Sequence, residues 1–184
     1  MDIDALHRKI EAATRAACAE MVHLHQDEGI YAFALYSDAG AMTVCPSTNT
    51  RAHLDSQDKA DAYYKFTPAE WKYEMQGADA AFNAISTLAR EIVFALKDRA
   101  SEGGVDDEMH REAFTTFRAA LFEACIAVLE KLKREGYFRQ TLGEEVFLAF
   151  DISDHDWEPA QLAAIITRLN DPPYRDEYLA WMQS

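Results

Sequence analysis

The sequence is poor in the residues that mark several common protein classes. Its 184 residues include three cysteines, seven glycines and five prolines, and only 18 basic residues stand against 32 acidic ones. The cysteines are odd in number and far apart, which argues against a disulfide framework and against a zinc site. We therefore expect three reduced cysteines in the core of a cytoplasmic protein.

Long hydrophobic runs and excess positive charge are also missing. No apolar stretch approaches membrane-spanning length, and the chain does not open with a charged segment followed by an apolar one. The net charge of −14 argues against nucleic-acid and anionic-membrane partners, because both require Lys and Arg to neutralise phosphates. It is compatible with a basic protein partner, although acidic charge also serves solubility alone.

Catalytic and cofactor-binding signatures are missing as well. The chain has no Gly-x-Ser-x-Gly elbow, no phosphate-binding P-loop and no dinucleotide fingerprint, and its six histidines lack metal-ligand spacing. We predict no cofactor, no bound metal and no catalytic residue, which favours a binding protein over an enzyme.

The hydrophobic fraction of 49% and the length predict one globular domain over residues 1–184. The stretch Ile30–Thr50 is its predicted centre. Ile30–Tyr36 is apolar on both faces, as in a covered strand, and Asp38–Gly40 predicts a turn with glycine at positive φ. Met42–Cys45 predicts a second strand that Pro46 ends.

Segments on either side of this centre predict helices and one more strand. Glu144–Ile152 is again apolar on both faces and is expected to pair with the Ile30 strand. Apolar stripes at helical spacing predict helices over 2–25, 78–98, 107–135 and 160–169, and a short one after Pro173. We expect an α+β fold: a small, mainly antiparallel sheet of three or four strands packed by about six helices.

Two further segments allow more than one interpretation. The polar run 47–50 is a ligand-binding loop, or a turn and N-cap for a helix over 51–64. Residues 63–73 contain five aromatics, which seal the edge of a core or form a stacking or partner-binding patch.

The segment Asp151–Glu158 is the densest group of reactive side chains. Carboxylates and the His155 imidazole after a buried strand can bind a divalent cation or perform acid–base chemistry. The glycine and the late glutamate of a calcium loop are missing, however. Capping of the following helix accounts for the same acidic residues.

Negative charge is concentrated near the C-terminus. From Glu144 onwards there are nine acids and two bases, a net charge of −7, and several aromatics lie among them. An acidic surface with aromatic anchors attracts and holds basic partners, whereas a solvated acidic face over an aromatic core is the alternative. The candidate partner-binding residues are Asp154, Asp156, Trp157, Glu158, Tyr174, Asp176, Glu177 and Trp181.

Five short segments resemble a bacterial family known as domain of unknown function 4303. They are Tyr31–Tyr36, Pro46–Thr50, Phe66–Tyr73, Glu135–Phe138 and Asp151–Asp154. The resemblance implies a small bacterial α+β protein, sometimes encoded among toxin–immunity and contact-dependent competition loci. It implies no catalytic residues.

These observations lead to three functional hypotheses. The first is an immunity-type protein that neutralises a basic cognate toxin. The second is a small-ligand- or metal-binding domain, or a hydrolase, that uses Asp151–Glu158. The third is a structural subunit that oligomerises through its aromatic patch. The sequence leaves the toxin and the oligomeric state open.

Overall fold

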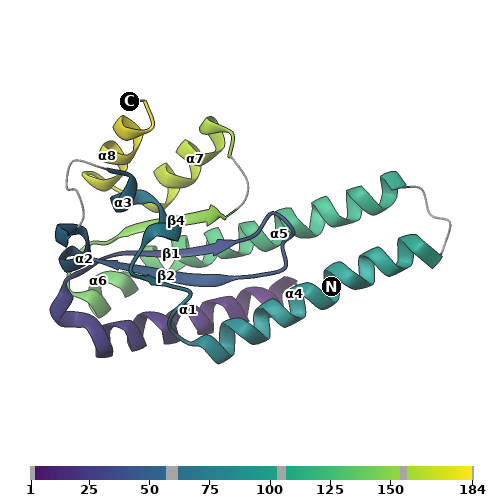
Figure 1. Cartoon of the computed structure of the whole chain (residues 1–184), viewed down its shortest axis with the longest axis horizontal. Helices are drawn as coiled ribbons and strands as arrows, with labels where there is room; N and C mark the ends of the chain where they lie inside the picture. The colour runs from purple at the N-terminus through teal and green to yellow at the C-terminus, as the bar shows by residue number, and fades with distance from the viewer. Residues whose placement is uncertain (1–2, 57–61, 103–106, 154–156, 184) are drawn as a thin grey trace.

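The fold is a four-stranded mixed sheet with helices on both faces (Figure 1), as a computed structural model shows for residues 3–56, 62–102, 107–153 and 157–183. The strands are β1 (Ile30–Ser37), β2 (Cys45–Thr50), β3 (Tyr73–Glu74) and β4 (Phe147–Ile152), in the spatial order β3-β2-β1-β4. The two pairs β1–β2 and β2–β3 are antiparallel, whereas β4 runs parallel to β1. The α+β prediction and the pairing of β1 with β4 are both confirmed.

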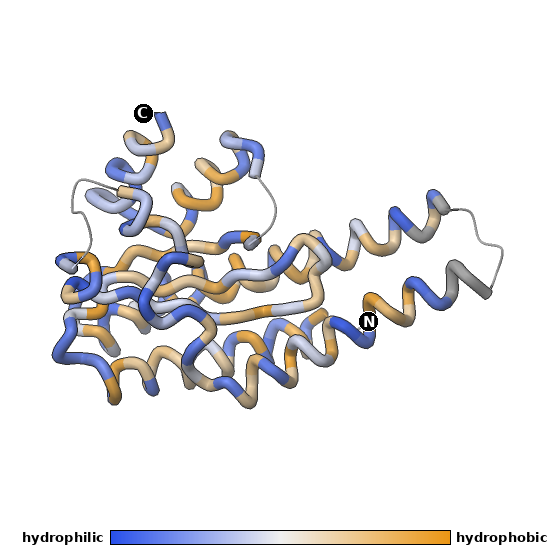
Figure 2. The backbone as a smooth tube through the Cα atoms, viewed as in Figure 1, coloured by the Kyte–Doolittle hydropathy of each residue, from blue (hydrophilic) through white to orange (hydrophobic). Residues whose placement is uncertain are grey.

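The first face of the sheet is covered by the long helices. These are α1 (Ile3–His25), α4 (Asp79–Glu102) and α5 (Asp107–Arg134), with the short α6 (Tyr137–Leu142) beside them. Figure 2 shows hydrophobic and hydrophilic residues alternating along these helices, as amphipathic helices require. Leu6, Ile10 and Ala13 of α1 illustrate the spacing, because all three are buried against Phe33 and Leu35 of β1 in one cluster.

The second face is covered by shorter helices. They are α3 (Ala62–Phe66), α7 (Pro159–Leu169) and α8 (Tyr174–Trp181). Alternate residues of β1 and β4, such as Ala34 and Ala149, form a separate buried cluster with Phe66, Trp71 and Tyr178. Because side chains alternate across a strand, β1 and β4 each supply both clusters, which explains why both faces of their sequences are apolar.

The predicted position of β2 is wrong. The strand does not span Met42–Cys45 but begins at Cys45 and includes Pro46 and the polar run 47–50. The Pro46 carbonyl accepts a hydrogen bond from the Met75 N–H, so the missing N–H of Pro46 also faces β3. Because this nitrogen points away from β1, its missing hydrogen removes no bond between β2 and β1.

The polar run 47–50 is a buried strand rather than a loop. Two of its side chains are hydrogen-bonded inside the protein: the Ser47 hydroxyl donates to the Pro68 carbonyl at 2.8 Å, and the Asn49 amide donates to the Tyr31 hydroxyl at 3.0 Å. The buried Thr48 hydroxyl has no hydrogen-bond partner among the described residues. Thr50 nevertheless accepts a hydrogen bond from the His53 N–H, so it caps α2 (Arg51–Ser56) as one interpretation predicted.

The turn after β1 also differs from the prediction. The residue at positive φ is Ala41 rather than Gly40, with a φ of 53°. A Cβ at Gly40 would lie 2.7 Å from a carboxylate oxygen of Asp38, so a larger residue there would have to displace this carboxylate, which accepts a hydrogen bond from the Met42 N–H.

The predicted helix count was lower than that found in the described residues, which contain eight α-helices and the 3-10 helices η1 (Gln26–Glu28) and η2 (Pro68–Glu70). In the region expected as one helix over 51–64, the structure has α2 at Arg51–Ser56 and α3 at Ala62–Phe66, and residues 57–61 lie outside the described residues. The residues after Gly136 form α6.

All three cysteines are free and buried, as predicted. Burial raises the pKa of Cys18 to about 12 and that of Cys125 further, so these thiols stay protonated at neutral pH. Among the described residues, no helix has the length and apolar character needed to cross a bilayer.

Candidate functional site

Exposed carboxylates line the helices near the C-terminus. Glu158 precedes α7 and is exposed, and Asp176 and Glu177 lie in the first turn of α8 with side chains 61% and 46% exposed. We call these three residues the acidic surface. Asp154 and Asp156, the other two acidic candidates, lie outside the described residues.

Two of these carboxylates have basic partners that are themselves accessible. Asp176 accepts a hydrogen bond from Arg175, its neighbour in the chain, at 2.8 Å. Glu177 contacts the Lys65 ammonium and so links α8 to α3. Such surface ion pairs contribute about 0–1 kcal/mol each, so a basic partner can replace them at little cost.

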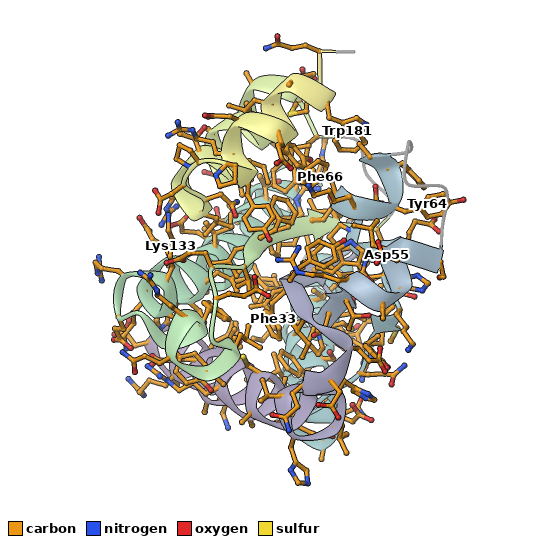
Figure 3. All side chains as sticks on the ribbon, turned by 90° about the vertical axis from the view of Figure 1, so that its left-hand side faces the viewer. Phe33, Asp55, Tyr64, Phe66, Lys133 and Trp181 are labelled. Atoms are coloured by element: carbon orange, nitrogen blue, oxygen red, sulfur yellow. The ribbon has the colours of Figure 1, made fainter. Side chains whose placement is uncertain are left out.

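The aromatic candidates lie deeper than the carboxylates. Trp181 is half-buried, with its ring 5.7 Å from that of Phe66, and Tyr174 packs 6.0 Å from Phe147 between ring centroids. Figure 3 shows Trp181 and Phe66 near each other at the end of the molecule that carries α8.

Trp157 is also half-buried, but on the other cluster, 6.2 Å from the ring of Phe150 and 6.4 Å from that of Phe122. All three aromatic candidates therefore have core contacts, and only part of each ring is available to a partner. The structure separates the carboxylates, which face solvent, from the aromatics, which hold the helices in place.

The aromatic segment 63–73 mainly seals the second cluster. Phe66 and Trp71 are each 3% exposed, whereas Tyr63 at 42% is one of its accessible rings. This arrangement favours the core-edge interpretation over a stacking platform.

A row of ionisable side chains crosses the sheet where β1 and β4 end. Tyr36 of β1 is in register with Cys45 of β2 and with Asp151 of β4, so the three side chains share the second face. The Tyr36 hydroxyl donates a hydrogen bond of 2.9 Å to Glu74 of β3. We call Cys45, Tyr36 and Asp151 the sheet-end row.

Burial changes the acidity of every member of this row. Desolvation raises the pKa of Asp151, and it raises the pKa of Cys45 to about 11 with a further contribution from the Glu74 carboxylate. The pKa of Tyr36 is also raised, first by burial and then by its hydrogen bond to Glu74. Neutral forms of the thiol and phenol are therefore favoured at physiological pH.

Sequence reasoning found Asp151 but missed Tyr36 as its neighbour, and it missed Cys45 and Glu74 as the neighbours of Tyr36. Their proximity depends on strand register, and β2 was predicted in the wrong place. Of the remaining residues in the predicted reactive segment, Glu158 points to solvent before α7, and 154–156 lie outside the described residues. Within the described ranges, no group of three or more His, Cys, Asp or Glu side chains is arranged to hold a metal ion.

Comparison with known proteins gives a family but no activity. Residues 10–171 match the family described as "Domain of unknown function (DUF4303)", and the chain belongs to this family. Searches of curated proteins and of solved structures each found no match.

Proposed function

We propose that this member of the DUF4303 family is an immunity-type protein that binds and neutralises a basic toxin through its acidic surface. The observation that supports the proposal is the exposure of the C-terminal negative charge. Six of the seven described acids from Glu144 onwards are exposed, and Asp151 is the exception. With a net charge of −7 over this region, these carboxylates favour a partner of opposite sign.

The arrangement also suits rapid association. A net charge of −14 on the whole chain attracts a basic protein over a long range and raises the rate of encounter. Arg175 and Lys65, which now contact Asp176 and Glu177, are displaced easily because these pairs lie at the surface. In this proposal Tyr174 and Trp181 hold α8 in place and contribute only their exposed edges to the partner.

The test is a charge reversal with a matched control. The first variant changes Asp154, Asp156, Asp176 and Glu177 to Lys together. The control changes the four exposed acids Asp4, Asp27, Glu91 and Asp98 to Lys, which alters the net charge by the same amount elsewhere on the surface. Both are assayed by calorimetry against the toxin product of the neighbouring gene, after circular dichroism confirms folding.

We expect the first variant to lose at least about 100-fold in affinity, because each reversal replaces an attraction by a repulsion at the interface. The control should lose less than about tenfold, since it changes only long-range attraction. A complex that survives the first variant with unchanged affinity would show that the interface lies elsewhere.

The second candidate is a ligand-binding or hydrolytic function that uses the segment Asp151–Glu158. The observation that favours it is the sheet-end row, in which the half-buried Asp151 carboxylate lies beside the Tyr36 phenol and the Cys45 thiol follows on the next strand. Melting is measured with Mg²⁺, Ca²⁺, Mn²⁺ and Zn²⁺ for the wild type and for Asp151→Asn. A cation that binds only the folded state raises the melting temperature of the wild type alone. No shift with any of the four would contradict a cation site.

A further inference from the structure

A concave site lies at the end of the sheet where β4 begins. The sheet-end row lies at the opposite end. The concave site is a cavity of about 280 Å³ between the C-terminus of α5, the helix α6 and the turn that joins α7 to α8. Its apolar lining includes Phe138, Leu148 and Leu169, none of which is more than 3% exposed. Figure 3 looks onto this end of the molecule and labels Lys133, a residue of the cavity wall.

The charge of this cavity is opposite to that of the chain. Lys133, Arg134 and Arg139 line it together with only two acids, Glu145 and Asp171, so the lining carries a net charge of +1. The whole chain carries −14. We call this site the basic cavity.

The cations of the basic cavity are available to a ligand. The Lys133 ammonium lies 2.9 Å from Asp171, and an Arg139 guanidinium nitrogen lies 3.3 Å from Glu145. Both carboxylates are mainly in solvent, 75% and 65% exposed, so these pairs are weak. Within the part of the chain that the structure describes, Arg134 is exposed and has no ion-pair partner.

Compensation of the α5 dipole explains basic residues in its last turn, but it does not explain the rest of the site. Arg139 comes from α6 and adds a third cation to the lining of a cavity that also has buried apolar residues in its wall. The opposite wall is fixed by two hydrogen bonds between Asn170 and the backbone of Leu148. The Asn170 side-chain oxygen accepts from the Leu148 N–H at 2.8 Å, and the Asn170 side-chain nitrogen donates to the Leu148 carbonyl at 2.7 Å. A preformed cavity with few convergent charges is typical of small-ligand sites.

We propose that the basic cavity binds a small organic oxyanion. Its carboxylate or phosphate group would be held by Arg134 with Lys133 and Arg139, and its short apolar part would lie on Phe138 and Leu169. Arginine favours such ligands because its planar guanidinium donates two parallel hydrogen bonds to an oxyanion. The volume equals that of about nine water molecules, which limits the ligand to the size of a small metabolite.

The test uses calorimetric titration with three probes at constant ionic strength: inorganic phosphate, succinate and phenyl phosphate. The variant is Arg134→Gln, and Lys9→Gln on the exposed surface of α1 is the control, because it removes one positive charge far from the cavity in sequence. We expect the wild type to bind phenyl phosphate or succinate at a single site and more tightly than inorganic phosphate. The organic probe that binds more tightly shows whether the site prefers a carboxylate or a phosphate group.

Arg134→Gln should weaken this binding at least about tenfold, and Lys9→Gln should leave it within about twofold. No saturable binding of any probe by the wild type would overturn the proposal. Equal losses in the two variants would do so as well, because they would indicate an adventitious ion only. Neither result depends on a toxin, so the site is tested separately from the proposed immunity function.

Discussion

At the scale of single residues, Asn170 shows how one side chain can complete a sheet. β4 is an edge strand, and its Leu148 peptide groups would lack partners on the outer side without the Asn170 carboxamide. Asn170 is only 2% exposed and also donates to the Ile166 carbonyl at 3.2 Å. The sequence marks this residue only as the end of a helix, because nothing local reveals its distant partner.

We predict that Asn170→Ala lowers the free energy of unfolding by about 3 kcal/mol, because it leaves a buried N–H and a buried carbonyl unpaired. Urea unfolding measures the change. The control is Asn83→Ala, at an exposed position of α4, which should cost less than about 0.5 kcal/mol. A loss below about 1 kcal/mol for Asn170→Ala would contradict the proposed role of its carboxamide.

Glu28 is a second residue whose contacts join distant segments. Its carboxylate accepts hydrogen bonds from the Lys72 ammonium and from the Tyr73 hydroxyl, each at 2.7 Å. These bonds lower the pKa of Glu28 from 4.5 to about 2, and the bond from Lys72 has the largest effect. Because the pKa is lower in the folded state, the stabilisation is complete above the unfolded-state value and is lost as the pH falls from 4.5 towards 2.

We predict that Glu28→Gln costs about 1 kcal/mol at pH 7, a value kept small because the side chain is partly solvated. The difference from the wild type should shrink when unfolding is measured at pH 3. Asp27→Asn, at the exposed neighbouring position, serves as the control and should cost less than about 0.5 kcal/mol. A difference that is equal at the two pH values would show that the charge of Glu28 is not responsible.

At the scale of elements, α8 is held on the sheet by aromatic packing. Tyr178 is 5% exposed and stacks on Phe147, with ring centroids 5.6 Å apart and an interplanar angle of 19°. Phe66 of α3 meets the same tyrosine at 5.2 Å. The position of the acidic residues Asp176 and Glu177 therefore depends on this contact.

We predict that Tyr178→Ala destabilises the protein by about 3 kcal/mol, the usual cost of removing a buried aromatic ring. Leu24→Ala, where the side chain is 57% exposed, should cost less than about 1 kcal/mol. Thermal unfolding of both variants tests this difference. Equal melting temperatures for Tyr178→Ala and the wild type would mean that α8 is not anchored by this ring.

The elements differ in how far their sequences predict them. α1, α4 and α5 follow from apolar stripes, because helical spacing is a local signal. β2 does not, since a polar residue such as Ser47 bonds to a partner, the Pro68 carbonyl, that only the fold brings near. The sheet-end row was hidden for the same reason, although Asp151 itself was found.

At the scale of the whole molecule, the residues that carry the net charge differ from those that form the core. The two buried clusters account for the fold, whereas the net charge of −14 lies largely outside them. The charge total and its C-terminal excess can be read directly from the sequence. The inverted charge of the basic cavity cannot, because its lining comes from three segments that are separate in sequence.

We predict that association with a basic partner slows steeply as salt increases. Raising NaCl from about 50 mM to about 500 mM should lower the association rate at least about tenfold, because ions screen long-range attraction. Stopped-flow mixing with the basic partner recovered by co-expression with the flanking genes measures the rate. The dissociation rate should change much less, and a rate of association independent of salt would show that charge does not guide the encounter.

The central claim is that this protein binds and neutralises a basic toxin, and co-purification tests it most directly. The tagged chain is co-expressed with the products of its two flanking genes, and the recovered complex is analysed for composition and stoichiometry. We expect recovery of a basic partner in stoichiometric amount, and loss of that partner from the variant that reverses Asp154, Asp156, Asp176 and Glu177. Recovery of the tagged protein alone, folded and soluble, would contradict the claim and leave the sheet-end row and the basic cavity as the sites to investigate.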